Sequence, residues 1–356
     1  MPVSVVVGGQ FGSEGKGKVA LYIAERTRAA AVVRVGGTNS GHTAAGRDGV
    51  TRALRQLPVS VLAPNAVAVL PAGAIIDPKI FFQEVKELGL GPDRVYVSPY
   101  ATLITESDKC IESESGLVER VGSTGSGTGA ALIRRMRRCS NDEPVLASQH
   151  PELAAFVKDT DAYFEHLLST GERIVIEGSQ GFGLSLLHGG FYPYATSRDT
   201  TAGAFVSEAG LSPRDVDDIT LVMRAFPIRV AGNSGPLFGE TSWAALAAKA
   251  GLPADFQEFT TSTRRVRRVG RFDANVVLCA IRANKPNRIV LNHFDYFNAA
   301  IRQGLFDEES RNLLVEKIER PICRQVDWIG TAPASLLDRI EAFPKNQAAR
   351  SSKKYM

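Results

Sequence analysis

The segment from Gly8 to Lys18 reads Gly-Gly-Gln-Phe-Gly-Ser-Glu-Gly-Lys-Gly-Lys, a pattern that suits the binding of phosphate groups. Glycines let backbone N–H groups approach an anion closely, and Lys16 or Lys18 would supply a point charge. An apolar run at residues 3–7 predicts a buried strand before the segment, and residues 17–28 predict a helix after it. Because a helix N-terminus favours negative charge, we expect a phosphate site between this strand and this helix.

The spacing of this glycine segment differs from that of an ordinary P-loop. Five residues separate Gly9 from Gly15, and Gly17 stands where a Ser or Thr would hold magnesium. A generic ATPase or GTPase is therefore disfavoured. A purely structural glycine turn is the alternative interpretation.

A second glycine-rich segment, residues 36–43, follows the next predicted strand and contains His42. Loops at successive strand ends of an open α/β sheet converge on one crevice, so we expect the two segments to lie close together. An isolated histidine is more often structural than catalytic. Beside an anion site, however, an imidazolium could stabilise developing negative charge.

The rest of the chain supplies the elements that must position these loops. Runs rich in β-branched residues predict strands at residues 3–7, 31–35, 66–70, 94–97, 173–176, 219–223 and 288–291, and helices are predicted at residues 17–28, 78–88, 152–169 and 243–249. This alternation predicts an α/β fold with a largely parallel central sheet, flanking helices and long active-site loops. No Pro- or Ser-rich linker divides the chain, so we expect one catalytic domain over residues 1–344 and a basic, flexible tail over residues 345–356.

Composition narrows the function classes. With 44% apolar and 22% charged residues, the chain matches soluble globular proteins. No apolar run approaches the ~20 residues that span a bilayer, so we expect a cytoplasmic protein, in the host cytoplasm if the chain is phage-encoded. The cysteines form no Cys-x-x-Cys pair, which argues against a zinc site or a disulfide framework and predicts free thiols in or near the core: Cys110, Cys139, Cys279 and Cys323.

Arginine residues gather in two short stretches although the net charge is only +4. The first stretch lies within residues 134–138 and the second within residues 264–268. Guanidinium groups suit phosphate and carboxylate partners, and a solvated basic surface is an equally good explanation.

Several segments together resemble the adenylosuccinate synthetase family. Its forms of the two glycine-rich segments are close to Gly-Gln-Trp-Gly-Asp-Glu-Gly-Lys-Gly-Lys and Gly-Gly-His-Asn-Ala-Gly-His-Thr. Further similar segments are residues 123–129, 177–181, 188–189, 192–197, 200–203, 258–270 and 329–333, so the resemblance spans nearly the whole chain. It implies a P-loop-related fold and a ligase that joins aspartate to C6 of a 6-oxopurine nucleotide, after a nucleoside triphosphate has phosphorylated O6.

The resemblance also implies roles for the residues at matching positions. The implied catalytic residues are Ser13, Lys16, His42 and Gln180. The purine nucleotide would be held by Ser13, Asn39, Thr124, Arg138, Gln180 and Thr196, with Arg138 the candidate that a second subunit contributes in a homodimer. The triphosphate would be held by Gly12, Gly15, Lys16, Gly17, Lys18, Thr43, Arg267, Asn292, Asp295 and Gly330. Aspartate would be held by Thr263 and Arg265, and Mg²⁺ by Ser13 and the carbonyl of Gly41.

Position 13 is the departure from the family pattern that matters most. The family usually places there an aspartate that accepts the N1 proton of inosine monophosphate (IMP), whereas this chain has Ser13. A hydroxyl is not an ordinary general base near neutral pH, so loss of function is one interpretation. A smaller, uncharged side chain would instead leave room for a purine with a 2-amino group, which is guanine. The same change marks the bacteriophage PurZ branch of the family, which joins aspartate to dGMP. We therefore expect a 2-amino-2′-deoxyadenylosuccinate synthetase that supplies 2-aminoadenine for DNA.

The triphosphate site departs from the family as well. The family's guanine-binding Thr-Lys-Leu-Asp becomes Asn-His-Phe-Asp at residues 292–295, and its Ser-Thr-Gly-Pro becomes Gly-Thr-Ala-Pro at residues 330–333. Loss of the lysine and the serine relaxes guanine recognition, although Asp295 could still bind a guanine edge. Because the phage branch that the chain resembles uses ATP or dATP, we expect these donors rather than GTP.

Two other functions stay open at this stage. The nearer one is an ordinary GTP-dependent adenylosuccinate synthetase acting on IMP. The remote one is a nucleotide-dependent nucleic-acid-binding protein that uses the arginine clusters, but aromatic residues do not interleave with them as a stacking platform requires. We expect no membrane association and no direct binding of nucleic acid.

Overall fold

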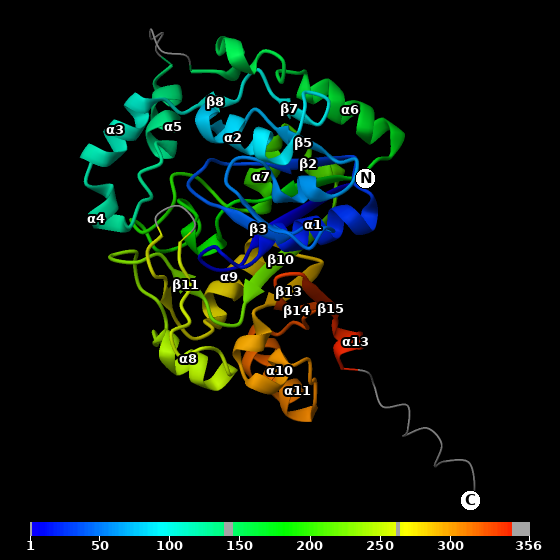
Figure 1. Cartoon of the computed structure of the whole chain (residues 1–356), viewed down its shortest axis with the longest axis vertical. Helices are drawn as coiled ribbons and strands as arrows, with labels where there is room; N and C mark the ends of the chain where they lie inside the picture. The colour runs from blue at the N-terminus through cyan, green and yellow to red at the C-terminus, as the bar shows by residue number, and fades with distance from the viewer. Residues whose placement is uncertain (1, 139–144, 261–263, 344–356) are drawn as a thin grey trace, which may run out of the picture.

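A nine-stranded sheet forms the centre of the computed structural model, which describes residues 2–138, 145–260 and 264–343 (Figure 1). The strand order is β15-β14-β13-β10-β1-β9-β2-β5-β7, and every neighbouring pair is parallel except β14 with β15. The strands are β1 (Val3–Gly8), β2 (Ala31–Arg34), β5 (Val67–Leu70), β7 (Val95–Val97), β9 (Ile174–Glu177), β10 (Val216–Arg224), β13 (Arg288–Asn292), β14 (Trp328–Ala332) and β15 (Ser335–Asp338). The predicted α/β fold with a largely parallel sheet is therefore confirmed.

Apolar side chains cover both faces of the sheet because successive residues of a strand point to opposite faces. Val5 and Ile176 belong to one buried cluster, whereas Val6 and Val175, their neighbours along the same strands, belong to the other. Helices α6 (Thr160–Thr170), α7 (Ala202–Ala209) and α9 (Ala274–Asn284) pack on the first face, and α1 (Lys16–Thr27) and α2 (Pro78–Leu88) pack on the second. Helices on both faces make this a doubly wound arrangement.

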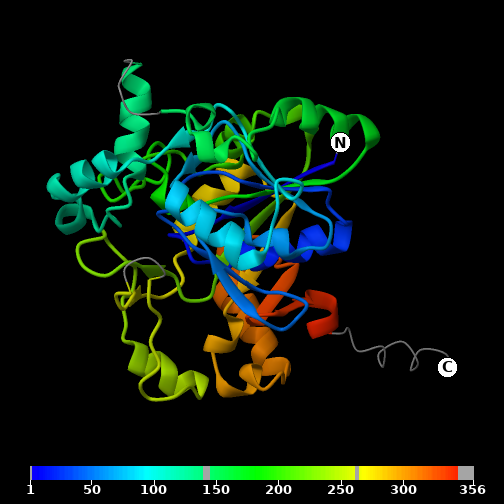
Figure 2. The ribbon, with the colours of Figure 1, turned by 45° about the horizontal axis from the view of Figure 1, so that its top comes forward.

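The remaining elements lie around this three-layer core. Figures 1 and 2 show α3, α4 and α5 together beside one end of the sheet, and α8, α10 and α11 together at the opposite end. The helices not yet given are α3 (Glu106–Glu114), α4 (Leu117–Val121), α5 (Thr128–Arg137), α8 (Trp243–Ala250), α10 (Ala299–Arg302), α11 (Glu308–Leu314), α12 (Arg320–Ile322) and α13 (Arg339–Ala342). Short strands pair as β3 (His42–Ala45) with β4 (Thr51–Leu54), β6 (Ile75–Ile76) with β8 (Thr102–Leu103), and β11 (Ile228–Arg229) with β12 (Arg268–Val269).

All seven predicted strands are present, but one predicted helix is wrong. Residues 152–169 do not form one helix, because α6 begins only at Thr160, where the Asp159 carboxylate accepts a hydrogen bond from the backbone N–H of Ala162. Before it, Val157 forms a bridge with Val97 of β7, so this stretch extends the sheet edge. Burial of the thiols was also predicted wrongly, since the cysteines that the structure describes are free but exposed: Cys110, Cys279 and Cys323.

The carboxyl ends of the parallel strands gather the predicted site segments at one edge of the sheet. The glycine segment follows β1, the His42 segment follows β2, and residues 178–201 follow β9. Asn292 ends β13 in the same direction. Ligands of open α/β sheets bind at this edge, so the fold brings distant segments into one crevice. No helix in the described ranges is long and apolar enough to cross a membrane.

Candidate active site

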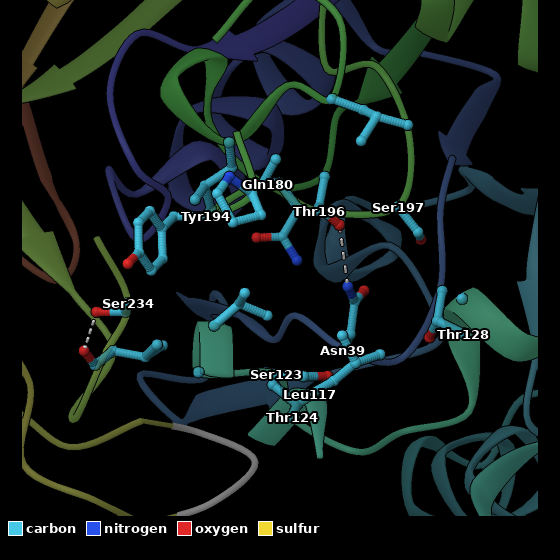
Figure 3. Close-up of a pocket in the computed structure, with 18 of the residues that line it drawn as sticks. Asn39, Leu117, Ser123, Thr124, Thr128, Gln180, Tyr194, Thr196, Ser197 and Ser234 are labelled. Atoms are coloured by element: carbon cyan, nitrogen blue, oxygen red, sulfur yellow. Dashed lines mark hydrogen bonds between the residues drawn. The ribbon is translucent and has the colours of Figure 1, made fainter. Parts of the chain in front are cut away.

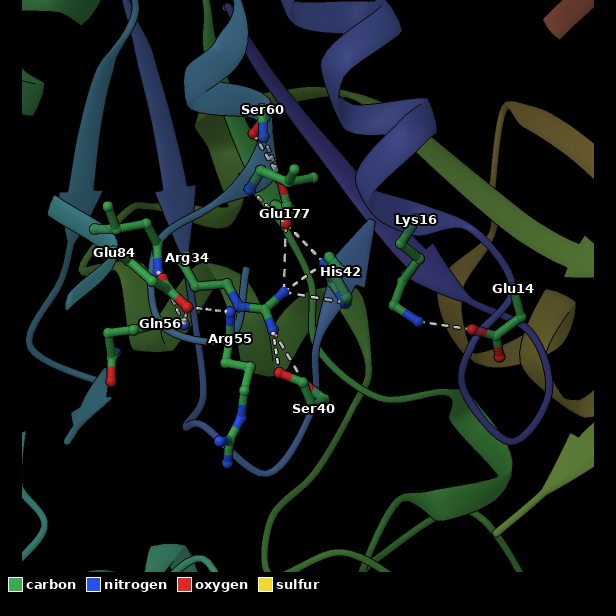
Figure 4. Close-up of polar contacts among 12 residues, drawn as sticks. Glu14, Lys16, Arg34, Ser40, His42, Arg55, Gln56, Ser60, Glu84 and Glu177 are labelled. Atoms are coloured by element: carbon green, nitrogen blue, oxygen red, sulfur yellow. Dashed lines mark hydrogen bonds and ion pairs between the residues drawn. The ribbon is translucent and has the colours of Figure 1, made fainter. Parts of the chain in front are cut away.

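The glycine segment wraps around the carboxylate of Glu14. Glu14 Oε1 accepts hydrogen bonds from the backbone N–H groups of Gln10 (3.1 Å) and Gly12 (2.8 Å), and Oε2 forms an ion pair of 2.6 Å with Lys16 Nζ. Ser13 adopts a left-handed backbone (φ 55°), uncommon for a residue other than glycine, and this turn directs Glu14 inward. Because Glu14 and Lys16 are both buried, the loop holds the lysine at the N-terminus of α1 (Figure 4).

His42 lies in a buried cluster with Glu177 and Arg34, as Figure 4 shows. Its Nδ1 is 2.7 Å from Glu177 Oε1, and Arg34 lies against the ring with Nη1 3.0 Å from Nε2. Glu177 also accepts hydrogen bonds from Ser60 N (3.0 Å) and Ser60 Oγ (2.7 Å). Burial alone would raise the pKa of Glu177, but the contacts with His42 and Arg34 outweigh it and lower that pKa to about 2.

The surroundings of His42 keep its ring neutral. Burial is the largest cause and the Arg34 guanidinium the next, and together they lower the pKa of His42 to about 3. The contact with Glu177 is therefore a hydrogen bond donated by a neutral imidazole and not an ion pair of an imidazolium. In this arrangement burial and Arg34 oppose the imidazolium expected from the sequence, whereas the role of His42 toward a bound substrate stays a prediction.

A pocket beside the N-terminus of α1, here named the Lys16 pocket, brings together residues from the two glycine-rich segments and from the ends of β13 and β14. Eleven of the predicted site residues line it: Ser13, Gly15, Lys16, Gly17, Lys18, Gly41, His42, Thr43, Arg267, Asn292 and Asp295. Gly12 and Gly330 do not line it, but Gly330 lies directly beside Asn292. The amides and lysines at a helix N-terminus make this pocket suitable for a polyphosphate.

Burial also shifts the pKa values of Lys18 and Asp295, which line the Lys16 pocket. Burial lowers the pKa of Lys18 to about 8, against the opposing effect of Asp295, and Lys18 Nζ donates to the carbonyls of Ala332 and Ser335, each at 3.1 Å. Burial raises the pKa of Asp295 to about 6. Both shifts reflect the cost of keeping a charge away from water.

Glu258 connects the second arginine stretch, residues 264–268, to the glycine segment. It forms ion pairs with Arg224 (2.5 Å) and Arg267 (3.1 Å), and Arg224 Nη1 donates to the carbonyl of Ser13 (3.2 Å). Arg267 is thereby held in the wall of the Lys16 pocket. Arg265 is exposed and lines neither the Lys16 pocket nor the second pocket described below. Thr263 lies outside the described residues.

A second pocket, here named the Asn39 pocket, contains four residues predicted to hold the purine nucleotide: Asn39, Thr124, Gln180 and Thr196. Figure 3 shows Gln180 and Thr196 on one side of it and Asn39 and Thr124 on the other. Asn39 Nδ2 is 3.4 Å from Thr196 Oγ1. Gln180 has a left-handed backbone (φ 63°), a costly conformation that often occurs where a side chain is aimed at a ligand. Ser13 lines the Lys16 pocket and not this one.

The Asn39 pocket is bordered by the N-terminus of α5 and by hydrogen-bonding side chains. Thr128 begins α5 in its wall, so backbone N–H groups at that helix N-terminus border the space. The only acidic residue that lines this pocket within the described ranges is Glu112, and its oxygens accept hydrogen bonds from the N–H groups of Gly127 (2.8 Å) and Gly129 (2.6 Å). Glu112 therefore occupies these N–H groups, and the donors that the pocket offers to a phosphate are side chains such as those of Asn39 and Thr124.

The arginine clusters are largely engaged within the chain. Arg134 pairs with Asp108 at 2.8 Å, Arg268 pairs with Glu240 at 2.6 Å, and Arg135 donates to the carbonyls of Ala72 and Tyr100. Arg138 lies at the exposed C-terminal end of α5 and lines neither pocket of its own chain. These contacts favour structural roles for the paired arginines over a basic surface for nucleic acid.

A magnesium ion would have to be held mainly by substrate. Over the described ranges no three His, Cys, Asp or Glu side chains gather in a way that could hold a metal. Mg²⁺ bound with nucleotide phosphates needs few protein oxygens, because it keeps phosphate and water ligands. The Ser13 hydroxyl and the Gly41 carbonyl, both in the wall of the Lys16 pocket, fit that requirement.

Sequence reasoning assigned no role to several residues that hold the site together: Arg34, Glu177, Arg224 and Glu258. A signal was available for three of them, because Arg34, Glu177 and Arg224 are charged residues at the ends of buried apolar strands. Glu258 had no such signal, since it lies in a loop.

Comparison with known proteins agrees with this geometry. The family model described as adenylosuccinate synthetase matches residues 5–142 and 144–302. Adenylosuccinate synthetases of Thermococcus onnurineus and Pyrococcus horikoshii are 36% and 33% identical to the chain, over 94% of the chain and 96% of each relative.

Two solved structures share the fold over 95% of the chain. One is the succinoaminodeoxyadenylate synthetase (PurZ) of cyanophage S-2L bound to dGMP and dATP, with a TM-score of 0.79, 28% identity and 95% of that chain covered. The other is the adenylosuccinate synthetase of Plasmodium falciparum, with a TM-score of 0.78, 21% identity and 99% of that chain covered. The chain belongs to the adenylosuccinate synthetase family and is a carbon–nitrogen ligase that joins aspartate to a purine nucleotide.

Proposed function

We propose that the purine nucleotide is dGMP and that the enzyme is a 2-amino-2′-deoxyadenylosuccinate synthetase. The γ-phosphoryl group of ATP or dATP is transferred to O6 of dGMP. The aspartate amine then attacks C6, and the C6–O bond breaks with release of inorganic phosphate. The products are the nucleoside diphosphate, phosphate and 2-amino-2′-deoxy-N6-succinyl-AMP, a precursor of 2-aminoadenine.

The two pockets divide the substrates between them. The Asn39 pocket takes dGMP, with its 5′-phosphate near Asn39, Thr124 and Thr196 and its base beside Gln180. The Lys16 pocket takes the triphosphate, whose phosphates face the amides at the start of α1. Lys16 then stabilises the charge of the transferring phosphoryl group, which is the main demand of such a reaction. Thr263 and Arg265 would hold aspartate.

The observation that carries the choice of dGMP is the side chain at position 13. Ser13 replaces the carboxylate that ordinary members use at N1 of IMP, and Glu14 does not replace it, because both its oxygens are occupied inside the loop. The smaller side chain leaves space for a 2-amino group and offers it a hydroxyl partner. The phage neighbour, whose structure contains dGMP and dATP, supports this choice.

An ordinary adenylosuccinate synthetase acting on IMP with GTP is the second candidate. Sequence similarity favours it, since the archaeal relatives described as adenylosuccinate synthetases are 33–36% identical and the phage neighbour is 28% identical. Position 13 favours dGMP, and we give it more weight because Ser13 lines the pocket that would hold the phosphoryl group transferred to O6.

Magnesium and a second subunit complete the proposed enzyme. When bound, Mg²⁺ would neutralise charge on the phosphates, with Ser13 and the Gly41 carbonyl as its protein ligands. A homodimer would let Arg138 reach the Asn39 pocket of the partner. Exposed Ile133 and Met136 on the same helix, α5, give that surface the apolar character of an interface.

A substrate panel tests this proposal. The purified enzyme is incubated with aspartate, Mg²⁺ and each of dGMP, GMP or IMP, with ATP or GTP as donor, and the succinylated products are quantified by mass spectrometry. We expect product from dGMP with ATP. Lys16→Ala should abolish it, whereas Lys79→Ala, at an exposed surface pair with Glu106, should not. Turnover of IMP without turnover of dGMP would overturn the proposal.

A further inference from the structure

The amide of Asn292 leaves one buried atom without a partner. Asn292 ends β13, is 1% exposed, and lines the Lys16 pocket. Its Nδ2 donates to the carbonyl of Glu14 at 2.7 Å, whereas its Oδ1 has no hydrogen-bond partner among the described residues. The orientation of this amide follows from chemistry, because the flipped amide would place its own oxygen against the carbonyl oxygen of Glu14. A buried acceptor without a donor costs free energy, so its persistence beside a ligand pocket points to a ligand.

Gly330 of β14 gives Oδ1 its space. A Cβ atom added at Gly330 would lie 2.0 Å from Asn292 Oδ1 and 2.5 Å from Lys18 Nζ, too close for any side chain. The long amide at position 292 therefore requires the absence of a side chain at position 330. The family pattern has Thr at position 292 and Ser at position 330. This chain instead has Asn292, whose Oδ1 is an acceptor, beside Gly330.

The surrounding wall suits the base end of a bound nucleotide. Asp295, Ala332 and Pro333 line the same pocket as Asn292. Asp295 presents a carboxyl group to any base placed there. Asn292 Oδ1 adds a site that accepts one hydrogen bond and cannot donate one.

We infer that Asn292 Oδ1 accepts a hydrogen bond from the 6-amino group of adenine and so selects an adenine triphosphate as phosphoryl donor. At C6, adenine carries an N–H donor, whereas guanine carries a carbonyl oxygen that would face Oδ1 as a second acceptor. A site built to bond an N–H group rejects ligands that lack it, because its own polar atom is then left unpaired. This inference rests on the proposed binding of the triphosphate in the Lys16 pocket.

The first test changes the ligand and leaves the protein intact. Dissociation constants are measured by calorimetry with Mg²⁺ for the non-hydrolysable β,γ-imido triphosphates of adenosine, guanosine and purine riboside, which has hydrogen at C6. The adenosine compound should bind about tenfold more tightly than the purine riboside compound, and more tightly than the guanosine compound. Equal affinities of the adenosine and purine riboside compounds, or tighter binding of the guanosine compound, would overturn the inference alone. Failure of all three compounds to bind would instead overturn the proposed function as well.

The second test restores the family's residue pair. The double variant Asn292→Thr with Gly330→Ser should lose most of the preference for the adenosine over the guanosine compound. Asn275→Thr, an exposed position of α9, is the matched control and should keep it. An unchanged preference in the double variant would contradict the inference. Because the first test uses the unaltered enzyme, it still decides the question if the double variant does not fold.

Discussion

Replacing Glu14 by glutamine tests whether the glycine segment is built around a buried ion pair. Lys16 and Glu14 are 1% and 0% exposed, and 2.6 Å separate Nζ from Oε2. The glutamine Oε1 can still accept from the N–H groups of Gln10 and Gly12, but its NH₂ group then faces the Lys16 ammonium. Breaking a buried pair by removing one partner costs roughly 3–5 kcal/mol, because the other charge is left uncompensated. Since the backbone contacts of Oε1 are retained, we expect a loss near the lower end, about 3 kcal/mol.

Equilibrium unfolding in urea, followed by circular dichroism, measures this loss as a lower transition midpoint at unchanged slope. The control is Glu25→Gln on helix α1, which follows the loop, where Glu25 and its partner Arg47 have side chains 28% and 66% exposed; there we expect a loss of less than about 1 kcal/mol. Activity of Glu14→Gln should fall together with stability, because Lys16 is no longer held at the start of α1. A Glu14→Gln enzyme as stable as the Glu25→Gln enzyme would refute this reasoning.

Three further perturbations probe the same region. Burial lowers the pKa of Lys18 to about 8, and only the ammonium form attracts phosphate, so kcat/KM for the triphosphate should fall as pH rises through about 8. Lys18→Arg should move that fall to higher pH. A pH profile that stays flat well above pH 8 would exclude this role for Lys18. Ser13→Asp should lower the ratio of kcat/KM for dGMP to kcat/KM for IMP on the order of tenfold, and aspartate is tolerated at this left-handed position. An unchanged ratio in steady-state assays would show that Ser13 does not determine the choice of substrate. Gly15→Ala should lower the melting temperature more than Gly89→Ala does. Both glycines have positive φ (90° and 62°), but a Cβ at Gly15 would lie 2.6 Å from Asn292 Nδ2, whereas a Cβ at Gly89 would face open space. Equal losses of stability would show that the contact with Asn292 does not matter.

Local sequence patterns predicted the parts of the site that depend on backbone conformation. The apolar run of β1, the glycines and the helix that follows together determine that a loop with free N–H groups lies at the carboxyl edge of the sheet. Strands buried on both faces are also visible as β-branched runs, so the sheet could be predicted without tertiary information. The helix expected over residues 152–169 was wrong because a tertiary bridge between Val157 and Val97 overrides local propensity.

The electrostatics of the site could not be predicted in the same way. The protonation of His42 depends on Arg34 and Glu177, and Glu177 lies 135 residues away in the sequence. The direction of Glu14 depends on the left-handed backbone of Ser13, which is not the glycine that such a turn usually selects. Both features arise from burial, and burial is a property of the assembled fold.

The central claim is that Ser13 belongs to an enzyme for a 2-aminopurine nucleotide, and direct competition between two substrates tests it. Equal concentrations of dGMP and IMP are supplied together with aspartate, Mg²⁺ and ATP, and the two succinylated products are quantified in the same sample. Because the ratio of the two initial rates equals the ratio of kcat/KM values, it reports substrate choice directly. We predict that the product of dGMP exceeds that of IMP by at least about tenfold, a difference of roughly 1.4 kcal/mol in transition-state binding. A product mixture dominated by adenylosuccinate, formed from IMP, would contradict the claim.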